Sequence, residues 1–106
     1  MAELVFCYMA ASNIKEAERI SNALIENRLA ACVNILGSIE SCYMWQGKKR
    51  KAGEVALIAK TRKSLLPKLV AMMKEIHSYE NPCIIAFPIV GGNEDFLKWV
   101  EKETES

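Results

Sequence analysis

The sequence lacks the residues that most catalytic sites need. It holds a single histidine, His77, and its four cysteines form no C-x-x-C pair. With one imidazole, no serine, histidine and acid set can be assembled, and no plausible nucleophile has a base beside it. We therefore expect neither an enzyme nor a protein that carries an organic cofactor.

Charge of either sign is also not in excess. The 14 basic and 13 acidic side chains nearly cancel, so no overall field attracts nucleic acid or an anionic membrane. The N-terminus has no basic region, and the apolar stretch after it is too short for a secretory signal or a membrane span. We expect a cytoplasmic protein with no nucleic-acid or membrane partner, whose cysteines stay reduced.

Glycine and proline are few, at five and three, and no linker, repeat or low-complexity tract interrupts the chain. The 106 residues with a 51% hydrophobic share are enough for one ordinary core. A single domain over residues 1–106 is expected.

In the first half, hydrophobic spacing predicts a strand, a helix and a long second strand. The uncharged run Leu4–Met9 suits a central strand. Asn13 followed by Glu16 resembles a capping box, and apolar residues recur at helical spacing until near Arg28. The segment Ala31–Trp45 then alternates as a strand does.

A long hairpin is predicted from the residues that follow. A bend or bulge is expected at Gly37-Ser38, the turn region is Gln46–Gly53, and Val55–Ala59 is apolar again. The four basic residues Lys48–Lys51 favour a solvated tip over a phosphate-binding patch, because no aromatic residue is interleaved with them.

The second half predicts a helix, a strand and a last helix. Ser64 is expected to cap the first of these helices, with Pro67 in its first turn and its end before Asn81. Cys83–Phe87 is an apolar strand, and Asn93 can cap the last helix. Three apolar residues of that helix are expected to dock on the body: Phe96, Trp99 and Val100.

This order predicts an α+β fold, the ferredoxin-like βαββαβ sandwich, with a long hairpin between its second and third strands and an extra C-terminal helix. Such sheets serve RNA-binding domains, metallochaperones, small phosphatases and regulatory trimers. The third strand, Glu54–Lys60, has no aromatic residue on which a base could stack. The loop Met9–Asn13 has neither a cysteine pair for Cu(I) nor an anion cradle with an arginine.

The hairpin carries Tyr43, Met44 and Trp45 beside polar positions. Exposed aromatic sheet edges invite association, so neighbouring subunits are expected to cover these side chains. The alternative is that they fold back on the last helix.

The turn after the second helix places an imidazole, a phenol and a carboxylate within a few residues. His77 and Glu80 offer ligands suited to Cu(II), Zn or Ni, and a symmetric oligomer could complete the coordination sphere. The other interpretation is that His77 caps the carbonyls at the end of that helix. Glu54 and Lys60, which interrupt an apolar strand, are candidates for a polar pocket.

Five segments together resemble the CutA divalent-cation tolerance family. They are Leu29-Ala30-Ala31-Cys32-Val33-Asn34, Tyr43-Met44-Trp45-Gln46-Gly47, Lys60-Thr61, His77-Ser78-Tyr79-Glu80-Asn81-Pro82 and Asp95-Phe96-Leu97-Lys98-Trp99. The resemblance implies a ferredoxin-like subunit, a trimer whose hairpins join sheets between neighbours, and a likeness to the PII signalling trimers. It also implies a link to tolerance of divalent cations, copper above all.

The same resemblance implies site residues. His77 matches the histidine most often proposed to meet metal, and Met9 falls where some relatives offer a cysteine ligand. The implied metal ligands are therefore His77, Glu80 and Met9. Positions that gather at the cleft between subunits match five residues here, and with Glu54 they form the predicted ligand pocket: Tyr43, Trp45, Glu54, Lys60, Tyr79 and Glu80.

The leading hypothesis is a cytoplasmic homotrimer that binds a divalent metal, copper or else zinc or nickel, or a small ligand at three equivalent clefts. The alternative is a PII-like signalling or scaffold trimer that binds a protein partner, with metal binding incidental.

Overall fold

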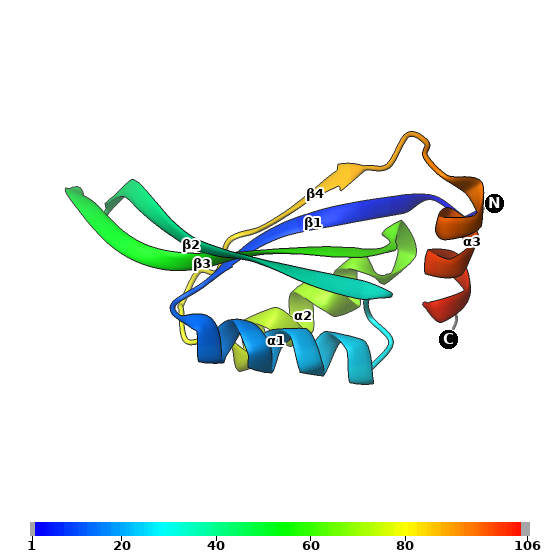
Figure 1. Ribbon diagram of the computed structural model, residues 1–106. Helices are drawn as coiled ribbons and strands as arrows, with labels where there is room; N and C mark the ends of the chain where they lie inside the picture. Colours follow the sequence, from blue (N-terminus) through cyan, green and yellow to red (C-terminus); the bar gives the residue numbers. More distant parts are fainter. Residues whose placement is uncertain (1, 105–106) are drawn as a thin grey trace.

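The described part of the chain, residues 2–104 of a computed structural model, holds four strands and three helices in the predicted order. Figure 1 shows their arrangement. The elements are β1 (Leu4–Ala11), α1 (Ile14–Glu26), β2 (Cys32–Trp45), β3 (Lys48–Arg62), α2 (Leu66–Ile76), β4 (Ile84–Pro88) and α3 (Glu94–Glu103), with a 3-10 turn at Lys63–Leu65.

The strands form one antiparallel sheet in the order β2-β3-β1-β4. Helices α1 and α2 lie on the same side of this sheet, and α3 lies at the end where the chain begins (Figure 1). The predicted ferredoxin-like α+β fold is confirmed. Within residues 2–104, no helix is both long enough and apolar enough to cross a membrane.

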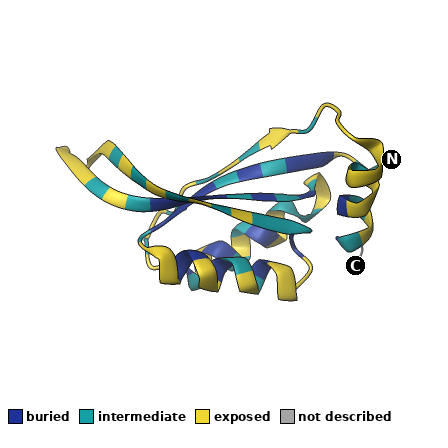
Figure 2. Ribbon diagram, in the orientation of Figure 1, coloured by how far each residue is buried: buried dark blue, intermediate teal, exposed yellow. Residues whose placement is uncertain are grey.

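The core lies between the sheet and the two helices, where Figure 2 shows the dark blue segments. Alternate residues of β1 and β3 point toward the helices, as the period of a strand requires. Burying each large apolar side chain contributes roughly 1.5–3 kcal/mol. The fully buried residues include Cys7, Met9, Leu57 and Ala59 of the sheet, Ile20 and Leu24 of α1, and Leu69 and Met73 of α2.

Helix α1 begins as the capping pattern predicts. The Asn13 side-chain oxygen accepts a hydrogen bond from the Glu16 N–H at 2.8 Å. The Glu16 carboxylate reaches back one residue further than in a regular capping box, to the N–H of Ser12 at 2.9 Å. The helix ends at Glu26, close to the predicted Arg28, whose φ of 54° lies in the left-handed region.

The prediction that Ser64 caps α2 is wrong. Ser64 lies inside the 3-10 turn, and no side chain caps the helix, which begins at Leu66 with Pro67 in its first turn. The Leu66 N–H donates to the Lys63 carbonyl instead. The backbone hydrogen bond of the 3-10 turn therefore replaces a side-chain cap. Pro67 has no N–H, so it requires no hydrogen-bond acceptor there.

The hairpin turn is tighter than predicted. Only Gln46 and Gly47 form it, with positive φ values of 50° and 76°, as a two-residue type I′ turn requires. The basic run Lys48–Lys51 belongs to β3 and pairs with the end of β2. The predicted bulge is confirmed, because the register shifts between Ile35 and Gly37.

Helix α3 is capped by Asn93, whose side chain accepts from the Asp95 N–H at 3.0 Å. Its docking is only partly as predicted. Val100 is fully buried, but Phe96 and Trp99 remain 40% and 42% exposed and contact each other with ring centroids 5.5 Å apart. Because α3 lies at the end of the sheet, only the side of the helix that bears Val100 packs against the rest of the protein.

Candidate functional site

A pocket of about 600 Å³ lies between the hairpin and the turn that follows α2. The hairpin contributes Ser41, Tyr43, Met44, Trp45 and Glu54, and the turn contributes Ser78, Tyr79, Glu80, Asn81 and Cys83. The structure thus brings together five of the six predicted pocket residues, all except Lys60.

One wall of the pocket is the face of the hairpin that bears Ser41, Tyr43 and Trp45. These residues alternate along β2 and therefore share one face. Tyr43 is 44% exposed and Trp45 is 37% exposed, so their rings are available to a ligand. This wall extends past the part of the sheet that the helices cover (Figure 1).

The two walls meet at the floor of the pocket, where Tyr79 of the turn contacts Glu54 of the hairpin. Burial, followed by a hydrogen bond to the Glu54 carboxylate, raises the pKa of Tyr79 to about 12. Burial, together with the nearby charge of Glu54, also raises the pKa of the Cys83 thiol. Both groups are therefore protonated at neutral pH, and the charge on the floor is the carboxylate of Glu54.

The turn that forms the opposite wall is held by a buried carboxylate of α1. The side chain of Glu16 is only 3% exposed and accepts hydrogen bonds from the Ser78 N–H at 2.8 Å and the Ser78 hydroxyl at 3.0 Å. The Ser12 hydroxyl at 2.8 Å and Arg19 at 3.2 Å complete the set. Glu16 therefore fixes the start of the turn to the N-terminus of α1.

These bonds decide the charge of Glu16. Burial alone would raise its pKa, but the hydrogen bonds from Ser12 and Ser78 stabilise the charged form more strongly and lower the pKa from 4.5 to about 2. The clamp is an ionised carboxylate throughout the physiological pH range.

His77 lies at the end of α2, but its ring is turned inward. Its Nε2 lies 2.8 Å from the Ala10 carbonyl oxygen, and its Nδ1 accepts from the Tyr79 N–H at 3.0 Å. Because a carbonyl only accepts and an amide N–H only donates, the ring is the neutral Nε2–H tautomer. Its side chain is fully buried, so a metal could reach it only if one of these bonds opened.

The remaining predicted site residues lie elsewhere. Met9 is fully buried in the core on β1, where its side chain packs. Lys60 lies between β2 and α3. Its ammonium donates to Asn34 at 2.5 Å and lies 3.6 Å from the Cys32 sulfur, both on β2. It also lies 5.8 Å from the centre of the Phe96 ring of α3. Among residues 2–104, no three His, Cys, Asp or Glu side chains gather closely enough to hold a metal ion.

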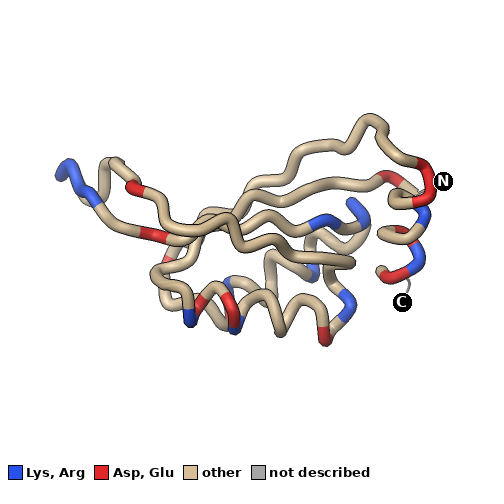
Figure 3. The backbone as a smooth tube through the Cα atoms, viewed as in Figure 1, with Lys and Arg blue, Asp and Glu red and all other residues tan. Residues whose placement is uncertain are grey.

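The far end of the hairpin is basic, as Figure 3 shows. Arg50 pairs with Tyr43, and Lys48 pairs with Trp45. Directly paired residues of antiparallel strands share a face, so aromatic and basic residues do interleave here, across the ladder. Spacing along the chain does not reveal this arrangement, because the two kinds of residue occupy different strands.

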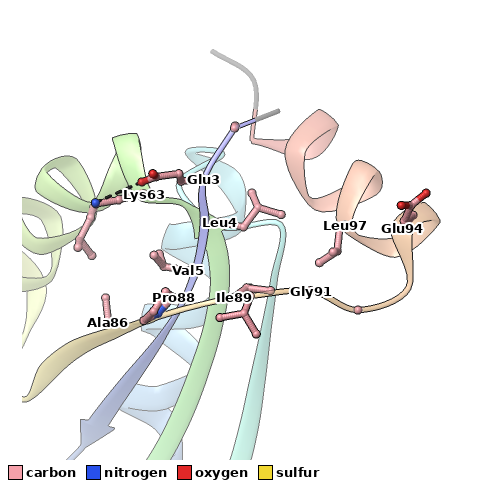
Figure 4. A pocket seen from close by; sticks show the side chains of 14 residues that line it. Glu3, Leu4, Val5, Lys63, Ala86, Pro88, Ile89, Gly91, Glu94 and Leu97 are labelled. Carbon is pink, nitrogen blue, oxygen red and sulfur yellow. Dashed lines mark ion pairs between the residues drawn. The ribbon is translucent and has the colours of Figure 1, made fainter.

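A second hollow, of about 760 Å³, lies at the opposite end of the molecule. Figure 4 shows its mainly apolar lining from β1, β4 and α3, with the ion pair between Lys63 and Glu3, at 3.2 Å, along its edge. None of the predicted site residues lines it.

Sequence reasoning missed two features of the site. The sequence predicts Glu16 as part of a helix cap, but its hydrogen bond to Ser78, 62 residues away, leaves no local signal. The apolar run predicts Cys83 as part of a strand, although Cys83 lies just before β4 and lines the pocket.

Comparison with known proteins identifies the family. The family profile described as "CutA1 divalent ion tolerance protein" matches residues 5–103. The chain belongs to this family. The family is described by tolerance of divalent ions and not by a catalysed reaction.

Individual relatives agree with this assignment. The divalent-cation tolerance protein CutA of Archaeoglobus fulgidus is 44% identical over 94% of this chain and 97% of its own. A structure described as the periplasmic divalent cation tolerance protein CutA of that organism has a TM-score of 0.93, with 43% identity over 96% of this chain and 99% of its own. The chloroplastic protein CutA of Arabidopsis thaliana is 38% identical over 96% of this chain. This chain spans only 56% of the length of that plant relative.

Proposed function

We propose that this chain acts in divalent-cation tolerance as a cytoplasmic homotrimer, and that the pocket beside the hairpin is its ligand site, closed by a neighbouring subunit. The observation that carries the proposal is an apolar sheet face that the described helices leave largely uncovered, since α3 reaches only its end near Lys60. Both α1 and α2 lie on the other face (Figure 1).

This open face consists of alternate residues on three strands. Ile85 and Phe87 of β4 are 53% and 45% exposed, and the Phe87 ring stacks on Phe6 of β1 with centroids 5.1 Å apart. A sheet normally buries both faces or makes one of them polar. The members of the open face are Phe6, Tyr8, Ile58, Ile85 and Phe87.

The edges of the sheet support the same assembly. Strands β2 and β4 form its two edges, and an uncovered edge can pair with a strand of another chain. The hairpin is long enough to extend past its own subunit (Figure 1). A closed ring of three copies would cover the open face and leave no sheet edge exposed.

Metal binding enters the proposal through Glu80 and His77. A single chain does not supply a full set of ligands for copper, zinc or nickel within its described residues, so the proposal needs ligands from a second subunit. His77 would take part only after its bond to the Tyr79 N–H opened. No metal role is proposed for Met9, because its buried side chain has no path to an ion.

Light scattering on the purified protein tests the assembly. We expect the mass of three chains for the wild type and a smaller mass for Ile85→Lys, which places a charge in the open face. Ile25→Lys is the matched control, because Ile25 is 43% exposed on α1, away from that face. A wild-type protein that stays a folded single chain at micromolar concentration would refute the trimer.

Calorimetric titration with Cu(II) and Zn(II) tests the metal site. Saturable heat is expected for the wild type and a weaker response for His77→Ala and Glu80→Gln. Glu80 is exposed, so its variant should fold normally even if His77→Ala does not. Equal heats from the wild type and Glu80→Gln, or no heat from either, would remove metal from this pocket.

A further inference from the structure

The residues that line the hairpin pocket have a one-sided chemistry. Among those that the structure describes there are three aromatic rings and two carboxylates, with no lysine, arginine or histidine. The groups concerned are Tyr43, Trp45, Tyr79, Glu54 and Glu80.

The rings come from both walls. Tyr43 and Trp45 stand on one face of the hairpin, and Tyr79 belongs to the turn that Glu16 holds in place. The faces of aromatic rings carry negative charge density and attract cations, indole most strongly. Rings on two sides of a pocket can therefore surround a cationic group.

The carboxylates add to the same field. Glu54 lies on the floor, where its charge helps to raise the pKa of both Tyr79 and Cys83. Since this region disfavours additional negative charge, it favours a positive ligand. Glu80 stands at the exposed side of the pocket.

Size distinguishes an organic cation from a bare metal ion. A volume of about 600 Å³ is in the range of small-molecule sites, whereas a metal ion needs several ligands at about 2 Å. Within residues 2–104 no cluster of three ligating side chains exists. A larger organic cation, with its charge spread over several atoms, can contact the aromatic rings of these walls and therefore fits the pocket better than a metal ion.

The cations at the end of the hairpin favour the opposite kind of ligand. Lys48 and Arg50 share the face of Trp45 and Tyr43, and they could hold an anion at the outer side. Both are exposed and neither lines the pocket. The pocket itself, which is lined on two sides by rings and carboxylates, therefore sets the preference for a cation.

We propose that the pocket binds an organic cation, an amine or quaternary ammonium group, between Tyr43, Trp45 and Tyr79 with Glu54 beneath it. The proposal rests on the proposed function only for the location of the site. The lining comes from one chain, so a failed test here would leave the trimer and the metal titrations unaffected.

Titration with choline chloride, followed by ¹H–¹⁵N NMR, tests the proposal. The indole N–H of Trp45 should shift saturably, while that of Trp99, on α3, should stay in place. The neutral carbon analogue 3,3-dimethyl-1-butanol has the same shape without the charge and should cause no saturable shift. Equal shifts with the two compounds, or no shift with choline, would overturn the proposal.

Variants locate the binding. Glu54→Gln and Trp45→Leu should each weaken choline affinity about tenfold, and Trp45→Phe should weaken it less. The amide of Cys83 reports binding where Trp45 is absent. Lys68→Gln is the control, because Lys68 is exposed on α2 and does not line the pocket, and it should leave the affinity unchanged. Inorganic phosphate shifting Trp45 while choline does not would assign the pocket to anions and refute the proposal.

Discussion

The two ends of strand β3 differ sharply, although they belong to one ladder with β2. From Val55 to Leu57 the strand is at most 6% exposed, under α1 and α2, whereas Lys48–Lys51 are exposed at the free end. Figure 2 shows this change along the ribbon. The backbone pairing is the same at both ends, so the difference comes from what covers each end. The covered end should supply the stability of the chain, and the free end is available for recognition.

The pocket lies where these two regions meet. Its turn wall is fixed to α1 through Glu16, while its hairpin wall leaves the body of the protein. One wall is therefore rigid and the other depends on a ladder of two strands. Substitutions can separate the contributions of the two regions.

The largest effect is expected in the covered end. Leu57→Ala removes a fully buried side chain and should lower the free energy of unfolding by about 2–5 kcal/mol. Lys49→Ala, in the same strand at the free end, should change it by less than about 0.5 kcal/mol. Urea unfolding followed by circular dichroism, at one fixed protein concentration, measures both. Similar losses would show that the free end is buried in solution.

The next effect concerns the clamp between α1 and the turn. Glu16→Gln should cost about 2 kcal/mol at neutral pH, because hydrogen bonds to a buried charge are strong. The folded-state pKa of about 2 lies below the ordinary value of 4.5 for a glutamate side chain. The contribution of Glu16 is thus complete above about pH 4.5 and is lost as the pH falls toward 2.

Urea unfolding between pH 7 and pH 2 measures this dependence. The wild type should lose stability across that acid range more steeply than Glu16→Gln. Glu18→Gln, an exposed carboxylate on the same helix, should retain the wild-type slope. A variant at Glu16 with an unchanged acid slope would contradict the clamp.

A smaller effect is expected at the bulge of β2. Gly37 has a φ of 112°, which a side chain rarely adopts, so Gly37→Ala should destabilise the protein by about 1 kcal/mol. Space is not the reason, because nothing lies within 4 Å of an added Cβ. Gly53→Ala has equal space without the positive φ and should be neutral or slightly stabilising. Thermal unfolding of both variants measures the difference in stability. Destabilisation by Gly53→Ala without destabilisation by Gly37→Ala would contradict the prediction.

The smallest effect is expected at the hairpin turn. Gln46 has a φ of 50°, a conformation that asparagine tolerates better, so Gln46→Asn should stabilise the protein by about 0.5 kcal/mol. Ser38→Asn, at an extended position of β2, should give no gain. Thermal unfolding again measures the difference, and destabilisation by Gln46→Asn would show that the turn is not of type I′ in solution.

Much of the fold could be predicted because its signals are local. The order of elements, the Asn13 cap and the bulge near Gly37 follow from short-range spacing and from the conformational freedom of glycine. The errors at Ser64 and Gln46–Gly53 are also local, since two ways of starting a helix or closing a hairpin fitted the same residues. Four of the predicted residues that line the pocket follow from motifs, and Glu54 follows from its charge in an apolar strand. Lys60 lies outside the pocket because its direction depends on contacts with β2 and α3.

The elements, their amphipathic faces and the family follow from the order of residues, because periodicity and motifs are local properties of the chain. The tertiary structure alone decided that His77 turns inward to Ala10 and that Glu16 holds Ser78. It also decided that aromatic and basic residues meet across the hairpin. These contacts join segments that are distant in the chain. Local sequence preferences do not specify which residue will lie against a given side chain after the protein has folded.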